Sequence, residues 1–168
     1  MSFLKENKKE FSKLIEQNQR IVHKITSVYA TSPEDREDLF QEICLQLWKS
    51  NSSFRKESKF STWVYRIGIN TAISSIRKAK NGYTFESLKA NHLKIEPVDD
   101  GENTKLLHDS ISKLNRIDKA IILLWLEEKN YEEIASIMGI TKSNVSVKLV
   151  RIKKKLEEMV TKSEKIAL

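Results

Sequence analysis

Polar and basic side chains gather between residues 141 and 151, where they are able to read DNA. We expect a helix here that Thr141 caps at its start. Its exposed face would carry hydroxyl, amide, amine and guanidinium groups that can reach base edges and phosphates in a major groove. The members of this face are Thr141, Lys142, Ser143, Asn144, Ser146, Val147, Lys148 and Arg151.

The residues just before this face have the spacing of a helix-turn-helix. Counting Tyr131 as position one, Ala135 falls at position five, where a small residue lets two helices cross closely, and Gly139 falls at nine, where a left-handed turn is needed. Apolar residues occupy positions four, eight, ten and fifteen (Ile134, Met138, Ile140 and Val145) and would form the wedge between the helices. An ordinary helical hairpin can show this spacing, but the polar face favours DNA binding.

A second stretch interleaves aromatic and basic side chains: Phe54, Arg55, Lys59, Phe60, Trp63, Tyr65 and Arg66. Aromatic rings can stack on unpaired bases, and cations can follow the backbone of a single strand. Phe60 and Trp63 near a helix start are also typical core residues, so both interpretations stay open.

A third surface is acidic. Asp38, Gln41 and Glu42 are spaced i, i+3 and i+4, on one face of a predicted helix and opposite Leu39, Ile43 and Leu47. Such a face is either simply solvated or a docking surface for a basic partner.

Catalytic, cofactor and metal chemistry are not indicated. The four glycines are too scattered for a phosphate-binding loop, and Cys44 and three separated histidines give no metal-ligand spacing. We therefore expect no enzyme, no cofactor and no metal. The longest apolar run, Ala120 to Leu126, is far too short for a membrane span, and a signal-peptide core is missing. These features favour a cytoplasmic protein without membrane insertion.

The elements that position these surfaces are predicted to be helices. One helix carries an apolar face from Phe11 to Tyr29. A second follows a Ser32 cap and carries Leu39, Ile43, Leu47 and Trp48 inward, and a third is capped by Ser61 or Thr62. Residues 50–59 read as a loop. Further helices are expected near 106–114 and 117–128, ahead of the helix-turn-helix.

Charge divides the chain, whose formal net charge is +7, into three parts. Residues 79–104 hold 3 basic and 5 acidic side chains together with Gly82, Pro97 and Gly101, which is typical of a linker. The two flanking segments are basic: 14 basic and 9 acidic side chains precede the linker, and 13 basic and 9 acidic side chains follow it. The predicted fold is therefore all-α, with two small helical domains joined by a flexible linker.

Taken in their order along the chain, these motifs resemble those of a bacterial RNA polymerase sigma factor of the extracytoplasmic-function group. The resemblance rests on residues 35–42 (DREDLFQE), Leu47-Trp48, residues 60–70 (FSTWVYRIGIN) and residues 131–149. It implies a region-2 domain over residues 1–80, a linker over 81–104 and a region-4 domain over 105–168.

The resemblance also implies partners and roles. Asp35, Asp38, Gln41 and Glu42 would bind the coiled coil of the largest polymerase subunit, while region 4 would meet the flap of the second-largest subunit. The residues 141–151 named above would read the promoter -35 element. The -10 element would be captured and melted by Asn51, Ser52, Ser53, Phe54, Arg55, Lys59, Phe60, Ser61, Thr62, Trp63, Arg66 and Asn70. An anti-sigma factor is left open as a further partner.

Two positions depart from the family pattern. Asn115 replaces the usual proline after Leu114, so the next helix should start with less constraint. Gly68 replaces a more common alanine, at a cost of about 0.5 to 1 kcal/mol unless another residue packs closely there. The alternative function is a polymerase-independent helix-turn-helix regulator, which would bind duplex DNA tightly by itself.

Overall fold

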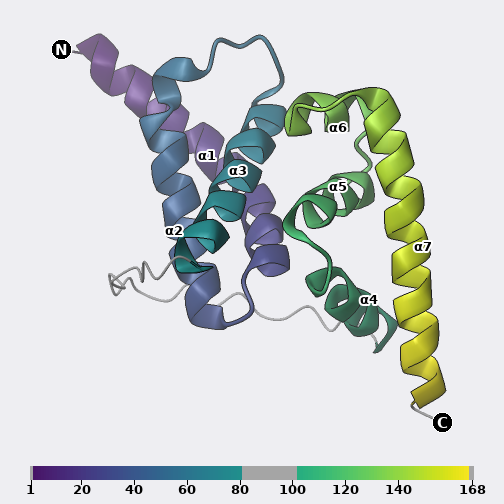
Figure 1. The fold of residues 1–168 in the computed structure, drawn as a ribbon. Helices are drawn as coiled ribbons and strands as arrows, with labels where there is room; N and C mark the ends of the chain where they lie inside the picture. The colour runs from purple at the N-terminus through teal and green to yellow at the C-terminus, as the bar shows by residue number, and fades with distance from the viewer. Residues whose placement is uncertain (1, 81–101, 167–168) are drawn as a thin grey trace.

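A computed structural model describes residues 2–80 and 102–166, and all regular structure in these two ranges is helical, as predicted (Figure 1). The first range contains α1 (Ser2–Tyr29), α2 (Pro33–Lys49), a short 3-10 turn at Asn51–Ser53, and α3 (Phe60–Lys80). The second contains α4 (Glu102–Ser112), α5 (Arg116–Leu126), α6 (Tyr131–Met138) and α7 (Lys142–Ile166). Most of the predicted linker, residues 81–101, lies outside the described residues.

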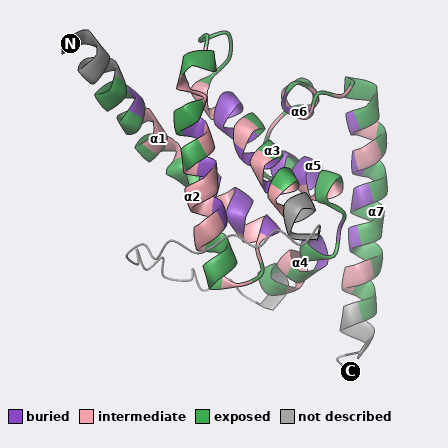
Figure 2. Cartoon of the chain, turned by 60° about the vertical axis from the view of Figure 1, so that its left-hand side comes forward, coloured by how far each residue is buried: buried purple, intermediate pink, exposed green. Residues whose placement is uncertain are grey.

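Helices α1, α2 and α3 pack against one another as a three-helix bundle. Each contributes fully buried aliphatic side chains, including Ile25, Ile43 and Ile69. Figure 2 shows buried residues on the sides of α1, α2 and α3 that face one another, with exposed residues on their outer sides. Gly68 is buried where α1 approaches α3, and a Cβ at this position would lie 2.6 Å from Cδ1 of Ile25. A close neighbour therefore occupies the space that alanine would need.

The second range folds around α7, which contacts α4, α5 and α6 along its length (Figure 1). The apolar side of α7 carries Val145, Leu149, Ile152 and Leu156, all buried. Because these residues recur every three or four positions, they line one face of the helix. The other face of α7 is left to solvent.

The ends of several helices confirm the sequence prediction. The Ser32 hydroxyl accepts a hydrogen bond from the backbone N–H of Asp35 at 3.0 Å, and Pro33 follows as the first helical residue. The hydroxyl of Thr141 accepts one from the N–H of Asn144 at 3.2 Å. Gly139 has φ 67°, the left-handed conformation that the turn requires.

Three local predictions were wrong. Helix α3 begins at Phe60, so Ser61 and Thr62 lie inside its first turn, because the backbone N–H of Trp63 already donates a helical hydrogen bond to the backbone oxygen of Lys59 at 3.2 Å. Trp48 is 42% exposed at the rim of the bundle, with one side against the Phe11 ring.

The third concerns Asn115, whose side chain caps α5. It accepts hydrogen bonds from the N–H groups of Ile117 and Asp118 at 3.1 and 2.9 Å. The start of α5 is thus well constrained without proline, because a side-chain oxygen satisfies two of the free backbone donors.

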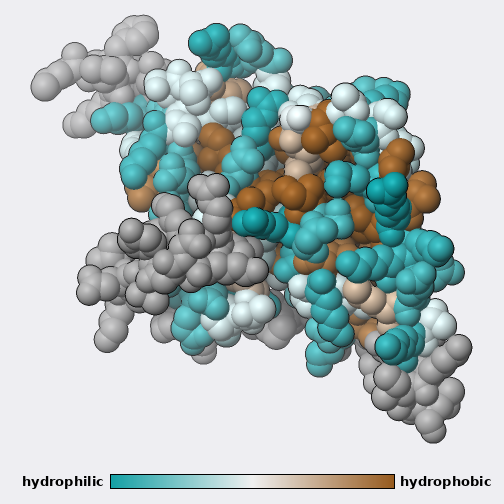
Figure 3. Space-filling view, in the orientation of Figure 1, coloured by the Kyte–Doolittle hydropathy of each residue, from teal (hydrophilic) through white to brown (hydrophobic). Residues whose placement is uncertain are grey.

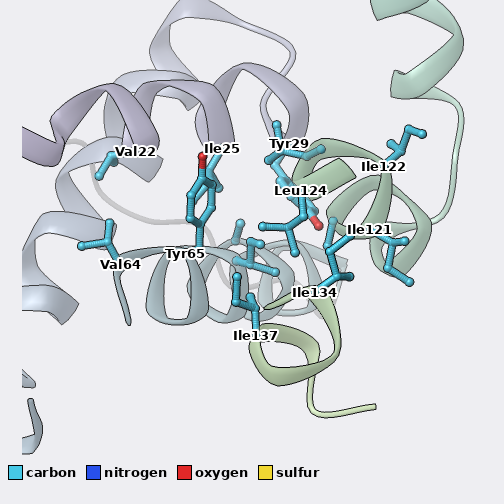
Figure 4. Close-up of a cluster of buried hydrophobic side chains, with 14 of the residues drawn as sticks. Val22, Ile25, Tyr29, Val64, Tyr65, Ile121, Ile122, Leu124, Ile134 and Ile137 are labelled. Atoms are coloured by element: carbon cyan, nitrogen blue, oxygen red, sulfur yellow. The ribbon is translucent and has the colours of Figure 1, made fainter. Parts of the chain in front are cut away.

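The two helical groups share one apolar core. Helix α1 contacts α4 and α5, and α3 contacts α5 and α6. Figure 4 shows Ile25 and Tyr65 from the first group beside Leu124, Ile134 and Ile137 from the second. The surfaces predicted to bind partners are therefore held together in a single body.

Candidate nucleic-acid interface

The predicted major-groove face lies on the solvent side of α7. Thr141, Lys142, Ser143 and Asn144 are exposed at its start, while Ser146 and Lys148 are half-buried further along. Val147 is 47% exposed, which leaves its methyl groups available for a thymine methyl. The buried Val145 and Leu149 fix the rotation of the helix, so the structure places these candidate residues on one side.

The turn before α7 is built as the spacing predicts. Ile134 and Val145 are fully buried between α6 and α7, with Met138 and Ile140 partly buried beside them. Helix α6 starts with a reciprocal cap in which Asn130 and Glu133 each accept a backbone hydrogen bond from the other. The buried wedge and this cap together fix the direction of α7 relative to α6.

Two cations of this face are already paired inside the molecule. Lys142 forms an ion pair with Glu132 of α6, and Lys148 Nζ lies 4.0 Å from an oxygen of Asp118 on α5. The hydrogen bond from Lys142 lowers the pKa of Glu132. The two carboxylates hold these lysines against α6 and α5, an arrangement that the sequence did not indicate.

Apolar side chains are also exposed beside this face. Leu126 and Val150 are 44% and 67% exposed, and Trp125 is covered on one side by Lys153, whose Nζ lies 3.8 Å from the ring centroid. Figure 3 shows hydrophobic residues at the surface over α6 and the upper part of α7, within a largely hydrophilic face. Lys153 is thereby held over an aromatic ring.

The aromatic residues of the second predicted surface form a cluster. Phe54, Phe60 and Trp63 have ring centroids 5.1 to 5.3 Å apart. Phe11 of α1 joins them, 5.8 Å from Phe60 and 6.0 Å from Trp63. The apolar periodicity puts Phe11 on one face of the first helix but does not connect it to this cluster, because no local signal relates residues more than forty positions apart.

The other candidates for the -10 element surround this cluster at different depths. Thr62 and Trp63 are buried, at 8% and 7% exposure. Asn51, Phe54, Phe60 and Ser61 are half-buried. The exposed members are Ser52, Ser53, Arg55, Lys59, Arg66 and Asn70. The structure thus gives an aromatic floor bordered by polar and basic side chains.

The acidic surface follows α2. Asp35 is exposed, whereas Asp38, Gln41 and Glu42 are half-buried, on the side away from the buried Leu39 and Ile43. Leu45, which is 44% exposed, continues the same face one turn later. Its position at i+7 from Asp38 is the signal that could have identified it.

The exposed guanidinium of Arg66 is held by the second helical group. It donates hydrogen bonds to the backbone oxygen and the hydroxyl of Ser136, at 3.0 and 3.1 Å. The neighbouring Tyr65 donates to Glu127 at 3.1 Å, and both burial and this carboxylate raise the pKa of the Tyr65 phenol. Glu127 was not identified from the sequence.

The described residues contain no group of acidic, histidine and cysteine side chains arranged to hold a metal ion. Within the same ranges, no helix combines the length and the apolar character that crossing a membrane requires. Cys44 is half-buried, and burial raises the pKa of its thiol to about 11, so the thiol stays protonated and weakly nucleophilic at neutral pH.

Residues 14–82 match the family model described as Sigma-70 region 2, and residues 104–156 match that of Sigma-70, region 4. An ECF RNA polymerase sigma-E factor of Haemophilus influenzae is 30% identical, covering 92% of this chain and 89% of that protein. The RNA polymerase sigma factor SigV of Bacillus subtilis is 27% identical over 84% of this chain and 86% of its own length.

Solved structures show the same fold. The sigma factor RpoE of Bartonella quintana, in complex with the anti-sigma factor NepR, is similar with a TM-score of 0.69 and 19% identity, over 91% of this chain and 98% of that one. CnrH, in complex with the cytosolic domain of CnrY, has a TM-score of 0.63 and 16% identity, over 90% and 87% of the two chains.

Proposed function

The chain belongs to the sigma-70 family of RNA polymerase sigma factors, in the extracytoplasmic-function group, and we propose how its surfaces divide the work of that family. It is a transcription initiation factor that binds core RNA polymerase and directs it to promoters. The proposal concerns which residues bind which partner. The observation that carries it is the exposed polar face of α7, fixed behind a left-handed turn at Gly139.

The proposed division follows the helical groups. Residues 1–80 form the region-2 domain and residues 105–168 the region-4 domain, with 81–104 as the linker. The two family matches and the three-helix and four-helix groups support these limits. Helix α4 begins at Glu102, so the second domain gains its first helix slightly before residue 105.

The region-4 domain reads the -35 element through α7. Ser143 and Asn144 lie exposed in the first turn, where a recognition helix meets base edges. Lys148 would exchange its long contact with Asp118 for DNA. Arg151, exposed one turn later, would hold a phosphate and so position the helix without reading sequence.

The region-2 domain captures the -10 element at the aromatic cluster. Melting needs no covalent chemistry, because an unpaired base only has to find a pocket and stacking partners that offset its unstacking. Phe54 and Phe60 are half-buried, so part of each side chain remains accessible for stacking. Arg55 and Lys59 are exposed next to them in the sequence and would bind the phosphates of the DNA strand. This is a binding role and not catalysis.

Core polymerase binds the acidic face of α2. Asp38 and Glu42 would meet a basic partner surface, and the exposed Leu45 would supply apolar contact within the same face. Charged groups around an apolar centre are the usual anatomy of a specific interface.

The wider setting follows from these partners. Core polymerase acts in the cytoplasm, and we propose the same location for this chain. The Bartonella quintana relative was solved with the anti-sigma factor NepR, and CnrH was solved with the cytosolic domain of CnrY, which supports an anti-sigma factor as a further partner of this chain. The comparisons do not favour the polymerase-independent regulator.

The test is a binding titration of the full chain with core polymerase freed of other sigma factors. We expect a complex that forms in solution and that binds promoter DNA, whereas the free chain binds the same duplex poorly at physiological salt. Tight, specific duplex binding by the free chain without a complex with core would contradict the proposed role.

A further inference from the structure

The cations of α7 differ in their surroundings along the helix. In its first two turns, Lys142 pairs with Glu132 of α6, and Lys148 Nζ lies 4.0 Å from Oδ1 of Asp118 on α5. Four exposed cations follow, and in the ranges that the structure describes none of them has a carboxylate partner: Arg151, Lys153, Lys154 and Lys155. The part of α7 that carries the proposed base-reading residues is therefore neutralised from inside the molecule, whereas the next part keeps its positive charge.

Asp118 is held in place by the cap at the start of α5. Asn115 Nδ2 donates a hydrogen bond to Oδ2 of Asp118 at 2.6 Å, and the backbone N–H of Asp118 donates to Oδ1 of Asn115 at 2.9 Å. The other carboxylate oxygen, Oδ1, is the one that faces Lys148. The Asp118 side chain is only 17% exposed, so water and salt screen its charge less than that of a fully solvated acid. Asn115 thus orients a partly shielded carboxylate toward the recognition helix.

Glu132 meets Lys142 in a more exposed setting. Lys142 is the first residue of α7, where the positive end of the helix dipole disfavours a cation. The hydrogen bond from Lys142 lowers the pKa of Glu132, so this carboxylate is ionised at neutral pH and offsets the charge of the lysine. The two side chains are 61% and 63% exposed, so DNA can compete with Glu132 for the ammonium group.

A lysine that is already paired gains little from a DNA phosphate. Moving its ammonium group to a phosphate exchanges one anion for another and leaves a carboxylate unpaired beside the negatively charged backbone. Contacts to phosphates supply nearly all of the sequence-independent affinity for DNA. Lys142 and Lys148 should therefore contribute little to the binding of a duplex that lacks the -35 sequence.

We propose that Asp118 and Glu132 are specificity-determining residues of the -35 site, which keep Lys148 and Lys142 from acting as free phosphate-binding charges. This inference rests on the proposed reading of the -35 element by α7. Neutralising either carboxylate releases one lysine, which then binds a phosphate of any duplex. At a matched site the base contacts fix the register of the helix and Lys148 faces bases, so a released Lys148 gains less there than on random DNA.

The experiment neutralises one carboxylate at a time in the full chain. Asp118→Asn keeps an oxygen that can accept from Asn115, and Glu132→Gln changes only an exposed side chain outside the α5 cap. The matched controls are Asp109→Asn and Glu128→Gln, because both residues are exposed and have no ion pair within the described ranges. Glu128 also lines the same surface pocket as Glu132. Fluorescence anisotropy measures how the free chain binds a labelled random-sequence duplex over a series of salt concentrations.

Asp118→Asn and Glu132→Gln should each steepen the dependence of log affinity on log salt by about 0.9, the contribution of one phosphate contact. The affinity for random DNA should then rise about fivefold at about 0.15 M salt, while the controls change neither value. In the complex with core polymerase, competition between random duplex and the -35 sequence that the wild-type complex selects measures specificity. Asp118→Asn should lower this preference by a similar factor.

The lysine partners separate this role from a structural one. In a Lys148→Gln background, Asp118→Asn should have no effect beyond that of its control, and the same should hold for Glu132→Gln in a Lys142→Gln background. The proposal is overturned by variants that bind random DNA no more tightly than the controls, by equal effects with and without the lysine, or by an unchanged preference of the Asp118→Asn complex. A wild-type chain that forms no complex with core polymerase contradicts the proposed function instead, since random-duplex binding is measured on the free chain.

Discussion

A methyl group added to Gly68 would lie 2.6 Å from Cδ1 of Ile25, at the crossing of α1 and α3. Glycine in a helix interior is normally less stable than alanine. Here the missing side chain makes room for a fully buried isoleucine from another helix. The departure from the family pattern at residue 68 therefore has a local packing cause.

Gly68→Ala should lower the free energy of unfolding by about 1 to 3 kcal/mol, because Ile25 has to move within a packed core. Ile25→Val alone removes Cδ1 and should cost about 0.5 to 1.5 kcal/mol. In the double variant the two losses should be clearly less than additive, since valine leaves space for the new methyl group. Denaturant unfolding of the four proteins measures this coupling, and strictly additive losses would contradict the packing explanation.

Asn115→Ala should destabilise the chain by about 1 kcal/mol, because two backbone donors at the start of α5 lose their acceptor. Asn115→Pro should recover part of this loss, because φ at residue 115 is −66°, the angle that proline imposes. Thermal unfolding ranks the three proteins. A proline variant less stable than the alanine variant would show that the cap geometry is misassigned.

Reversing the charges of Asp38 and Glu42 to lysine should weaken core polymerase binding at least tenfold, because two attractive contacts become repulsive. The fold should survive, since neither side chain belongs to the buried core. The control reverses Glu10 and Glu16, two exposed acids of α1. Equal core affinity of both double variants, with intact circular dichroism, would remove the polymerase site from α2.

Asn144 and Lys148 are expected to select bases, whereas Arg151 and Lys153 hold phosphates. Substituting the first pair should change the preferred -35 sequence in a selection experiment. Alanine at either of the second pair should weaken all sequences alike and reduce the salt slope by about 1 for each phosphate that is no longer bound. Variants of Asn144 and Lys148 that keep the original -35 preference would contradict this division.

The helix-turn-helix could be predicted from sequence because its determinants are local. The turn at Gly139, the cap at Thr141 and the wedge of Ile134 and Val145 all lie within fifteen residues. The same holds for the cap at Ser32, which a single hydroxyl provides.

What the sequence did not reveal depends on contacts between distant segments. Glu127 receives Lys24 and Tyr65 from 103 and 62 residues away, and neither pair has a periodic signature. Trp48 was misplaced because apolar periodicity alone does not distinguish a core position from the rim of a small bundle. The cap at Asn115 is a different case, because asparagine is a preferred N-cap residue and the local sequence does carry that signal.

Transcription in vitro tests the central claim most directly. Core enzyme freed of other sigma factors is given genomic fragments with and without the full chain, and transcript starts are mapped. The account predicts starts that depend on this chain, preceded by shared -10 and -35 sequences, and a free chain that binds the same duplexes weakly. Tight, specific binding of those duplexes by the free chain, with no transcript started by the cognate core, would contradict it.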